Sequence, residues 1–486
     1  MTHKYKSNYD KFPLVQISEN EAIISGWEEI ISEIKEEQPK TIVIECYHGV
    51  SVKLLISKLK LYFVDATVLS MNRGFKDEAS MEQYLRPFLT NDRIFGRMSN
   101  LTLDAYYKDC ELDKMKREWC KIRGVKIAIG VGASLLSEES DLFIYADMPR
   151  WEIQKKFREK ILGNIGASNV GEDFFLLYKR AYFCDWRACD RMKQTTFTKW
   201  DFILDTTDNE NPKFLTVDNL IMGLQKCAQQ PFRLVPFFDP GPWGGQWMKE
   251  VCDLDRSQSN YAWCFDCVPE ENSLALKYGT KHIEIPAINL VFFQSQKLLG
   301  DQIISQFGKE FPIRFDFLDT MDGGNLSLQV HPLKAYIKKH FGMDYTQDES
   351  YYFLDTGEDA HVYLGLLEEI DPAAMMTDLE KAQRGEIVFP ADKYVNKFKV
   401  KKHDHILIPA GTIHCSGKNS MVLEISATPY IFTFKLWDWG RLGLDGLPRP
   451  IHLDHGKNAI QWERKTSFAE NELINNIKKK NTFITR

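Results

Sequence analysis

The sequence predicts a two-domain protein in which an α/β domain precedes an all-β domain. Its 486 residues exceed the roughly 100 to 200 residues of one typical domain. In the first part, strand-like apolar runs alternate with helical segments, which is the pattern of an α/β fold. The second part is rich in short strand-like runs separated by turn signals, which favours a β-barrel or sandwich. We place the boundary near residue 228, which gives domains at 1–228 and 229–486.

The strands expected in the first domain are short apolar runs. They lie at 41–45, 63–69, 125–132, 142–148 and 201–207. Segments with helical periodicity, including 52–60 and 151–162, separate several of these runs. Because parallel strands need long crossover connections, we expect a parallel sheet with helices on both of its faces.

The second domain is expected to be all-β with helical insertions. Tight-turn sequences divide it into short strands: DGGN at 322–325, DTGED at 355–359, PAGT at 409–412 and SGKNS at 416–420. The segment 371–385, DPAAMMTDLEKAQRG, has the character of an inserted helix. These signals predict a barrel or sandwich interrupted by helices.

Charge and composition exclude several classes of partner. The chain has 62 basic and 68 acidic residues, a formal charge of −6, so it has no overall attraction to nucleic acid or to an anionic membrane. No stretch approaches the roughly 18 apolar residues of a membrane span, and the N-terminal segment lacks a signal-peptide core. The ten cysteines are dispersed. We therefore expect a cytoplasmic protein with reduced thiols, and the sequence leaves its oligomeric state open.

The segment ECYHGVSVKLL, residues 45–55, has the strand, turn and helix order of a P-loop. In a P-loop the backbone amides and a lysine hold phosphate groups. Here only Gly49 matches; Val52 stands at the lysine position, and Lys53 and Leu54 stand where the hydroxyl residues belong. Phosphoryl transfer would therefore lack its charge clamp.

The segment 142–191 resembles the late strand and arginine-bearing lid of uridine-kinase-like P-loop enzymes. The resemblance implies a degenerate P-loop nucleoside-kinase-like domain with a structural, regulatory or residual ligand-binding role. Arg180, Arg187 and Arg191 could contact an anion or lie in solvent. A residual nucleotide or anion ligand of this domain stays an open alternative.

The second domain carries residues that suit a metal ion. Gln329 and His331 are two residues apart in LSLQVHP, so in a strand both side chains point to one face. Glu349 precedes an aromatic strand, and His414 follows the sharp turn LIPAGT. Two imidazoles, a carboxylate and an amide oxygen suit a divalent first-row metal, most plausibly zinc.

From 232 to 455 the chain resembles the type I mannose-6-phosphate isomerases, a cupin-fold family. The motifs are PFFDPGPWGG, LDTMDGGNLSLQVHPLKAY, DAHVYLGL, DHILIPAGTIHCSGKNSMVLEIS and LWDWGRLGLDGLPRPIHLD. The resemblance implies that Gln329, His331, Glu349 and His414 bind one Zn²⁺ per chain and that the substrate is a small sugar phosphate.

Candidate catalytic and substrate-binding residues follow from the same motifs. Lys435 and Arg441 are the proposed catalytic residues, with Asp438 as a further candidate. His403 and His405 are the remaining candidates, with a surface position favoured for both. A base must move a proton between two carbons, and a fixed cation must stabilise the enediolate.

The resemblance implies that Ser327 contacts the phosphate and that Gln347 stands at a substrate-binding position associated with phosphate binding or proton transfer. Two positions depart from the family pattern: Gln347 replaces a lysine, and Lys435 replaces an arginine. Losing a cation weakens phosphate binding, because charge-assisted hydrogen bonds are stronger than neutral ones.

The leading hypothesis is a zinc-dependent isomerase that interconverts mannose 6-phosphate and fructose 6-phosphate, fused to an inactive kinase-like domain. A second hypothesis keeps the metal cupin but gives it an unphosphorylated or different sugar. A third is a non-catalytic sugar-sensing or regulatory protein. Turnover of free and phosphorylated sugars separates these readings.

Overall fold

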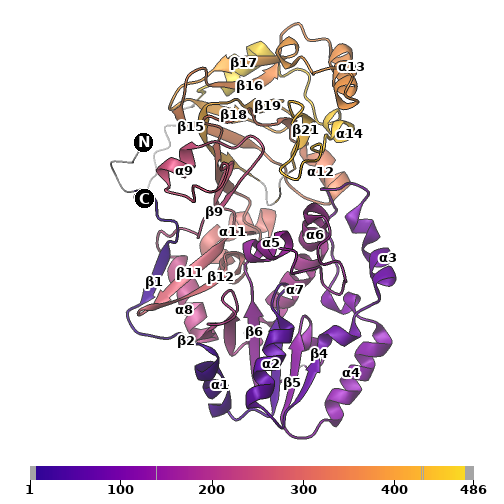
Figure 1. The fold of residues 1–486 in the computed structure, drawn as a ribbon, viewed down its shortest axis with the longest axis vertical. Coiled ribbons are helices and arrows are strands. Elements are labelled where there is room, and N and C mark those ends of the chain that lie inside the picture. Colours follow the sequence, from indigo (N-terminus) through magenta and orange to yellow (C-terminus); the bar gives the residue numbers. More distant parts are fainter. Residues whose placement is uncertain (1–6, 138, 428–429, 431, 477–486) are drawn as a thin grey trace. The chain divides into compact units, whose positions relative to one another are not determined.

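The computed structural model describes residues 7–137, 139–427, 430 and 432–476 (Figure 1). The chain forms two compact units. The α/β unit comprises Phe12–Val235 and Pro269–Glu310, and the β unit comprises Met1–Lys11, Pro236–Val268 and Phe311–Arg486. The α/β unit thus includes a segment, 269–310, that lies beyond the predicted boundary at residue 228. No helix in the described ranges is both long and apolar enough to cross a bilayer.

A seven-stranded sheet forms the centre of the α/β unit, in the order β2-β8-β7-β6-β3-β5-β4. Its strands are β2 (Ile24–Ser25), β3 (Thr41–Cys46), β4 (Thr67–Ser70), β5 (Lys126–Gly130), β6 (Leu142–Asp147), β7 (Phe202–Asp205) and β8 (Lys213–Thr216). Strands β4, β5, β3, β6 and β7 run parallel to one another. Strand β8 is antiparallel to β7, and β2 is antiparallel to β8. The predicted parallel sheet is therefore present.

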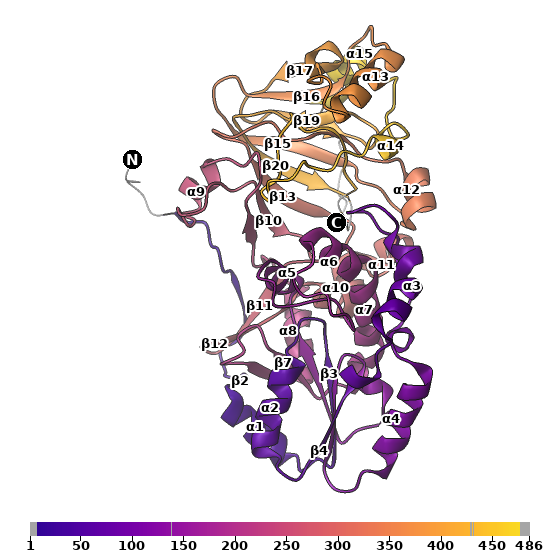
Figure 2. The same ribbon diagram turned by 45° about the vertical axis from the view of Figure 1, so that its right-hand side comes forward.

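Helices surround this sheet, with α2 and α4 on opposite faces (Figure 2). The helices of the unit are α1 (Trp27–Glu36), α2 (Val52–Tyr62), α3 (Glu78–Leu89), α4 (Asp109–Lys121), α5 (Arg150–Arg158), α6 (Phe174–Arg180), α7 (Trp186–Thr196), α8 (Val217–Cys227), α10 (Ile288–Phe293) and α11 (Ser295–Phe307). The strand predicted at 63–69 starts only at Thr67. The reason is that α2 runs to Tyr62 and its C-cap, Phe63, is followed by a turn.

Residues 269–310 supply two strands to a second, three-stranded sheet in the α/β unit. Strand β11 (Ser273–Tyr278) lies between β1 (Leu14–Ser18) and β12 (Lys281–Pro286). Strands β1 and β11 are parallel, and β11 and β12 form an antiparallel pair. The segment is thus tied by backbone hydrogen bonds to the start of the chain.

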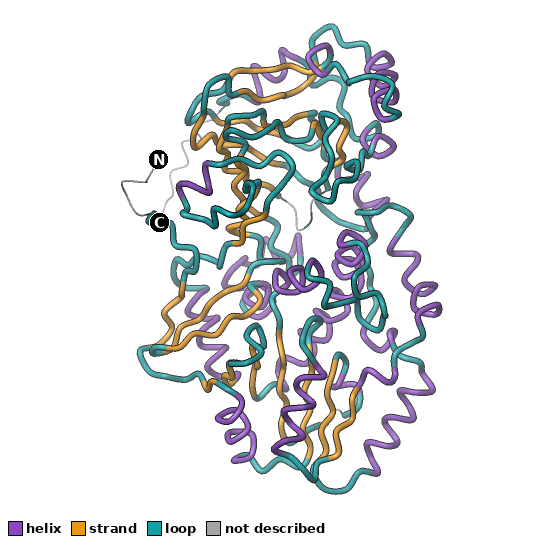
Figure 3. Tube along the Cα trace, in the orientation of Figure 1, coloured by secondary structure: helices purple, strands orange, loops and turns teal. Residues whose placement is uncertain are grey.

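The β unit consists of two antiparallel sheets (Figure 3). The six-stranded sheet has the order β18-β15-β20-β13-β10-β9, and the five-stranded sheet has the order β17-β16-β19-β14-β21. Their strands are β9 (Phe237–Asp239), β10 (Trp263–Cys267), β13 (Arg314–Asp319), β14 (Leu328–Val330), β15 (Glu349–Thr356), β16 (His361–Leu366), β17 (Val395–Lys399), β18 (His405–Ile408), β19 (His414–Ser416), β20 (Ser420–Ser426) and β21 (Phe434–Trp437).

Short helices interrupt the β unit, as the sequence predicts. They are α9 (Trp247–Val251), α12 (Lys334–Phe341), α13 (Pro372–Gln383), α14 (Leu453–Gly456) and α15 (Thr466–Phe468). Helix α13 occupies the insertion expected at 371–385. The Asp371 carboxylate accepts hydrogen bonds from the amides of Ala373 and Ala374, and Pro372 occupies the first helical position, where it sacrifices no hydrogen bond.

Candidate metal centre

Three predicted metal ligands meet in the interior of the β unit. The Nε2 atom of His331 lies 3.1 Å from Glu349 Oε2, and the Nε2 atom of His414 lies 2.7 Å from Glu349 Oε1. Both imidazoles are fully buried and Glu349 is 5% exposed. Glu349 comes from the six-stranded sheet and His414 from the five-stranded sheet, so the inner faces of the two sheets meet at this point.

The fourth predicted ligand, Gln329, reaches the same point. Its side-chain amide nitrogen lies 3.2 Å from Nε2 of His414. In the backbone register Gln329 of β14 lies directly opposite His414 of β19 and Lys435 of β21. Directly opposed residues in antiparallel strands place their side chains on one face. Gln329, His414 and Lys435 therefore form a row across three strands.

A sharp turn before β19 positions His414. Gly411 has a φ of +91°, which favours glycine, and its amide donates to the His331 carbonyl oxygen at 2.9 Å. A Cβ atom at Gly411 would lie 2.5 Å from Gln461 Cγ. The turn thus links the backbones that carry the two histidines, as the PAGT motif predicts.

Backbone carbonyls fix the orientation of both imidazoles. His331 Nδ1 lies 3.0 Å from the carbonyl oxygen of Phe432, and His414 Nδ1 lies 2.9 Å from that of Thr412. A carbonyl oxygen can only accept, so each Nδ1 carries a proton and each Nε2 faces Glu349. Metal-binding histidines are usually held in this way.

Burial and the two histidines act in opposite directions on Glu349. Burial raises its pKa, but the neighbouring His331 and His414 outweigh burial and hold the pKa well below its usual range. A carboxylate therefore faces two imidazole nitrogens at 2.7 and 3.1 Å. The candidate ligand atoms of His331, Glu349 and His414 all lie within 4.8 Å of one another. The donor set fits a divalent metal ion such as zinc.

Gln347 lies beside Glu349 rather than at a separate site. Its amide nitrogen donates to Glu349 Oε2 at 3.0 Å, and the Gln347 side chain is buried. The amide therefore orients the carboxylate and adds no positive charge.

Ser327 and Arg441 belong to an ion-paired cluster around Asp438. Ser327 Oγ donates to Asp438 Oδ1 at 3.0 Å and accepts from Arg449 at 3.2 Å. Arg449 also lies 2.7 Å from Asp438 Oδ2. Arg441 donates to Asp438 and to the Asn325 carbonyl oxygen. Arg449 is a candidate that the sequence analysis missed; its signal is the motif GLPRP.

The two remaining histidine candidates lie away from this cluster. His403 is exposed, has a φ of +75°, and pairs with the hydroxyl of Tyr352 at 2.7 Å. His405 is half-buried on β18, an edge strand of its sheet. Both positions agree with the surface interpretation.

The sequence analysis also missed a group of buried polar residues on the six-stranded sheet. Asp316 on β13 and Tyr351 on β15 both lie opposite Glu424 on β20, and Arg314 lies opposite Ser426. Burial raises the pKa of Asp316 to about 7, and burial together with Glu349 raises that of Glu424. The signal was the alternation of charged and aromatic residues in RFDFLD, 314–319.

In the α/β unit, the predicted P-loop turn is filled by the unit's own side chains. Both nitrogens of His48 have partners: the Gly163 carbonyl oxygen at 2.9 Å and the Trp186 indole at 3.1 Å. Lys156 donates to the Gly49 carbonyl oxygen at 2.9 Å, and a Cβ atom at Gly49 would lie 2.7 Å from Ile153. The turn is therefore buried, and the His48 ring and the Gly49 carbonyl oxygen are hydrogen-bonded within the unit.

The three arginines of the predicted lid also have partners within the α/β unit. These are Asp185 and the Ile165 carbonyl for Arg180, Glu270 for Arg187, and the carbonyls of Ser99 and Leu101 for Arg191. Each of the three guanidinium groups thus has an ion-pair or hydrogen-bond partner inside the unit.

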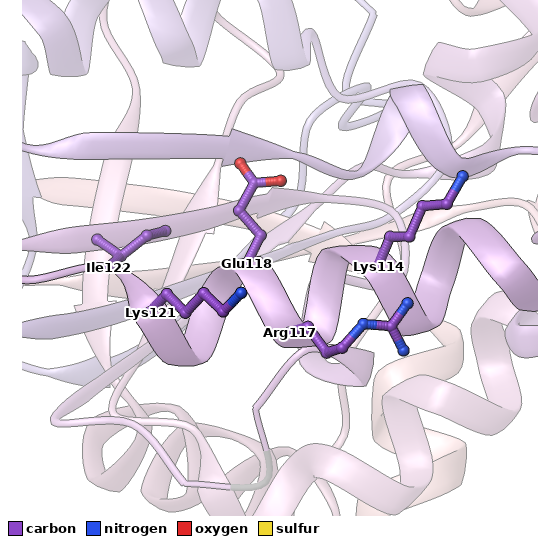
Figure 4. A pocket seen from close by; sticks show the side chains of 5 residues that line it. All are labelled: Lys114, Arg117, Glu118, Lys121 and Ile122. Atoms are coloured by element: carbon purple, nitrogen blue, oxygen red, sulfur yellow. The ribbon is translucent and has the colours of Figure 1, made fainter.

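A shallow hollow on the surface of the α/β unit lies against α4 (Figure 4). It is lined by Lys114, Arg117, Glu118, Lys121 and Ile122. None of the four candidate metal ligands lines it.

The chain matches one family model and several known proteins. Residues 26–229 match a family described as Domain of unknown function (DUF8485). A probable mannose-6-phosphate isomerase of Bacillus subtilis, GmuF, is 32% identical over 233 residues, which cover 47% of this chain and 68% of the relative. The chain belongs to the mannose-6-phosphate isomerase family.

Two further members of the family show the extent of the likeness. Mannose-6-phosphate isomerase ManA of Bacillus subtilis is 29% identical over 247 residues, 50% of this chain and 71% of the relative. A crystal structure of the mannose 6-phosphate isomerase from Bacillus subtilis matches at 22% identity with a TM-score of 0.40, covering 47% of this chain and 68% of that one. Membership rests on about half of the chain.

Proposed function

We propose that the β unit is a zinc-dependent aldose–ketose isomerase that interconverts mannose 6-phosphate and fructose 6-phosphate. One zinc ion per chain would be held by Gln329, His331, Glu349 and His414. The observation that carries the proposal is the approach of two imidazoles and a carboxylate to one buried point. Two relatives in the same family are named mannose-6-phosphate isomerases.

The reaction moves a carbonyl group between C1 and C2 of the sugar. A proton leaves the carbon next to the carbonyl, an enediolate forms, and a proton is returned one carbon away. Zinc, when bound, supplies positive charge that stabilises the developing negative charge on the sugar oxygens. Gln347 would hold Glu349 in its binding orientation through the amide hydrogen bond.

Lys435 is the residue we propose to act in catalysis, as a cation beside the enediolate or as the group that moves the proton. Its place in the row with Gln329 and His414 supports this role. Arg441 is held by Asp438 and by the Asn325 carbonyl, so we propose that it acts through the shape and charge of that cluster. Ser327, between Asp438 and Arg449, would contact the phosphate.

Zinc analysis together with an isomerase assay tests the proposal. Purified protein should contain one zinc per chain and convert mannose 6-phosphate to fructose 6-phosphate in a coupled assay. His414→Ala should lose both zinc and turnover, whereas His403→Ala should keep both, because His403 is exposed and lies outside the donor set. Zinc-loaded wild-type protein that turns over no hexose phosphate would contradict the proposal.

A second candidate substrate is an unphosphorylated or differently phosphorylated sugar. It is favoured by Gln347, which donates to Glu349 and offers no positive charge. If this reading is right, the protein should turn over free aldoses better than their phosphates.

For the α/β unit we propose a degenerate P-loop nucleoside-kinase-like domain without phosphoryl transfer. The occupied turn at His48 and the paired lid arginines support a structural or regulatory role. Binding of ATP, uridine or inorganic phosphate, measured by calorimetry, tests for a residual ligand. Nucleotide binding without isomerase activity would favour the third reading, a sugar-sensing protein.

We propose a cytoplasmic location, because the ten cysteines are free thiols.

A further inference from the structure

Three residues that neighbour the candidate ligand Glu349 each carry a buried polar atom without a hydrogen-bond partner in the described chain. These atoms are Oε1 of Gln347, the hydroxyl of Tyr351 and the hydroxyl of Ser426. Gln347 is 3% exposed, Ser426 is 2% exposed and Tyr351 is fully buried. Each atom makes no hydrogen bond to any part of the chain that the structure describes.

The strand register brings these three residues together. Glu349 and Tyr351 are two residues apart on β15, so their side chains share one face, and the Gln347 amide lies against Glu349. Ser426 on β20 lies directly opposite Glu349. Figure 2 shows β15, β20 and β13 side by side in this sheet. The three unpaired atoms therefore border one carboxylate.

Unpaired buried polar groups are costly. Each costs on the order of 1–3 kcal/mol, and native proteins leave few of them without a partner. Three such atoms belong to residues that neighbour Glu349 in the sheet or by hydrogen bond. Their common neighbour is a carboxylate that we assign to the metal, so the missing partner is a polar molecule bound beside the metal.

The hydrogen-bonding chemistry of these three groups indicates which kind of molecule could bind them. The Tyr351 and Ser426 hydroxyls donate and accept, and Gln347 Oε1 accepts. On the same sheet Glu424 lies opposite Tyr351, Asp316 lies opposite Glu424, and a cation, Arg314, lies opposite Ser426. A sugar hydroxyl both donates and accepts, so it satisfies all three atoms. A phosphate dianion only accepts, so it could not satisfy Gln347 Oε1, and it would lie close to the negative charge of Glu349.

We propose that Tyr351, Ser426 and Gln347 form a subsite for the uncharged hydroxyl groups of the sugar, next to the metal. The proposal deepens the assigned isomerase function and rests on it for the presence of a sugar. It assigns recognition of the sugar hydroxyls to β15 and β20. Any phosphate group is bound elsewhere.

Calorimetric binding of mannose and mannose 6-phosphate to the zinc-loaded protein tests the subsite. Tyr351→Phe keeps the ring and removes the hydroxyl. It should weaken binding of both sugars by the same factor, about five- to tenfold for one lost hydrogen bond, with zinc content unchanged. Tyr352→Phe is the matched control, because its hydroxyl lies on the opposite face and pairs with His403. The control should bind both sugars like the wild type.

Ser426→Ala is a second, smaller change in case Tyr351→Phe does not fold, and it should show the same equal weakening. The subsite is refuted if the folded variants bind both sugars normally, if only mannose 6-phosphate binding weakens, if zinc is lost, or if the wild type binds neither sugar. Wild-type binding of mannose without any isomerase turnover would defeat the proposed function and leave the subsite intact.

Discussion

Replacing Glu270 by alanine should strongly destabilise the α/β unit. Glu270 is 5% exposed and accepts hydrogen bonds from Arg150 and, at 3.0 Å, from Arg187. Arg150 is 1% exposed, and its other carboxylate partner is Asp190 at 2.6 Å. The substitution leaves the buried Arg150 and the partly buried Arg187 with one carboxylate, Asp190, between them.

The pKa of Glu270 gives the size of the effect. Burial raises the pKa, but Arg187 and Arg150 outweigh burial and lower it from 4.5 to about 2. At about 1.4 kcal/mol per pKa unit this corresponds to roughly 3 kcal/mol. Removing one partner of a buried ion pair typically costs about 3–5 kcal/mol. The free energy from the pKa agrees with the typical cost of breaking a buried ion pair, so we expect Glu270→Ala to lower the free energy of unfolding by about 3–5 kcal/mol.

Urea unfolding at pH 7, followed by tryptophan fluorescence and circular dichroism, measures this change. Trp186 is a useful reporter, because its ring lies 5.0 Å from the Arg150 guanidinium. Glu111→Ala is the control, since Glu111 forms an exposed pair with Lys114 on the same unit, and it should change little. A loss below about 1 kcal/mol for Glu270→Ala would refute the reasoning.

The pH dependence of the same variant supplies an independent check. A carboxylate whose pKa is lowered by folding contributes its full stability above the unfolded value of 4.5, and it loses that contribution as the pH falls towards about 2. Wild type and Glu270→Ala should therefore differ most at neutral pH and converge in acid. A constant difference from pH 7 to pH 2 would show that lost packing, rather than the ion pair, causes the effect.

Three further predictions follow from local contacts. Burial lowers the pKa of His48 below 6.5, so the free energy of unfolding should fall as the pH drops from 7.5 to 5.5, as measured by urea titrations. The fall should be smaller in His48→Gln, and an equal pH dependence of the unfolding free energy in both proteins would contradict this. A Cβ atom at Gly323 would lie 2.4 Å from the Trp243 carbonyl oxygen, so Gly323→Ala should cost about 1–3 kcal/mol in thermal unfolding, and an unchanged midpoint would disprove the contact. Zinc at about a hundred times its Kd should stabilise the wild type by about 2.7 kcal/mol but not His331→Ala, and an equal response of both would exclude His331 as a ligand.

The regular elements of the first part could be predicted because their signals are local. Apolar runs gave the positions of the parallel strands, and helical spacing gave α2 and α5. The start of β4 at Thr67 was missed, since the apolar residues 63 and 64 extend the run without joining the sheet. The pairing of β11 with β1 could not be read from local pattern, because it joins residues about 260 positions apart, such as Leu14 and Ala275.

The candidate site shows the same limit. The motifs around Gln329, His331, Glu349 and His414 could be recognised individually, and the structure brings their side chains to one point. Alternation within a strand tells which residues share a face, but it does not tell which strands are neighbours. The position of Tyr351 between Glu349 and Glu424 needs the order β15-β20-β13, so no sequence signal could have identified it.

Together, the proposed isomerase function and the proposed hydroxyl subsite predict how the sugar is oriented in the site. The six-stranded sheet offers hydroxyl and amide groups at Tyr351 and Gln347, while the five-stranded sheet places Lys435 in the row of Gln329. Positive charge for a phosphate is thus available beside β14 and β21, where Arg449 contacts Ser327. A phosphorylated substrate would bind with its hydroxyls towards β15 and its phosphate towards β14. Substitutions on the first side should then weaken all sugars equally, and substitutions of the cations on the second side should weaken only phosphorylated ones.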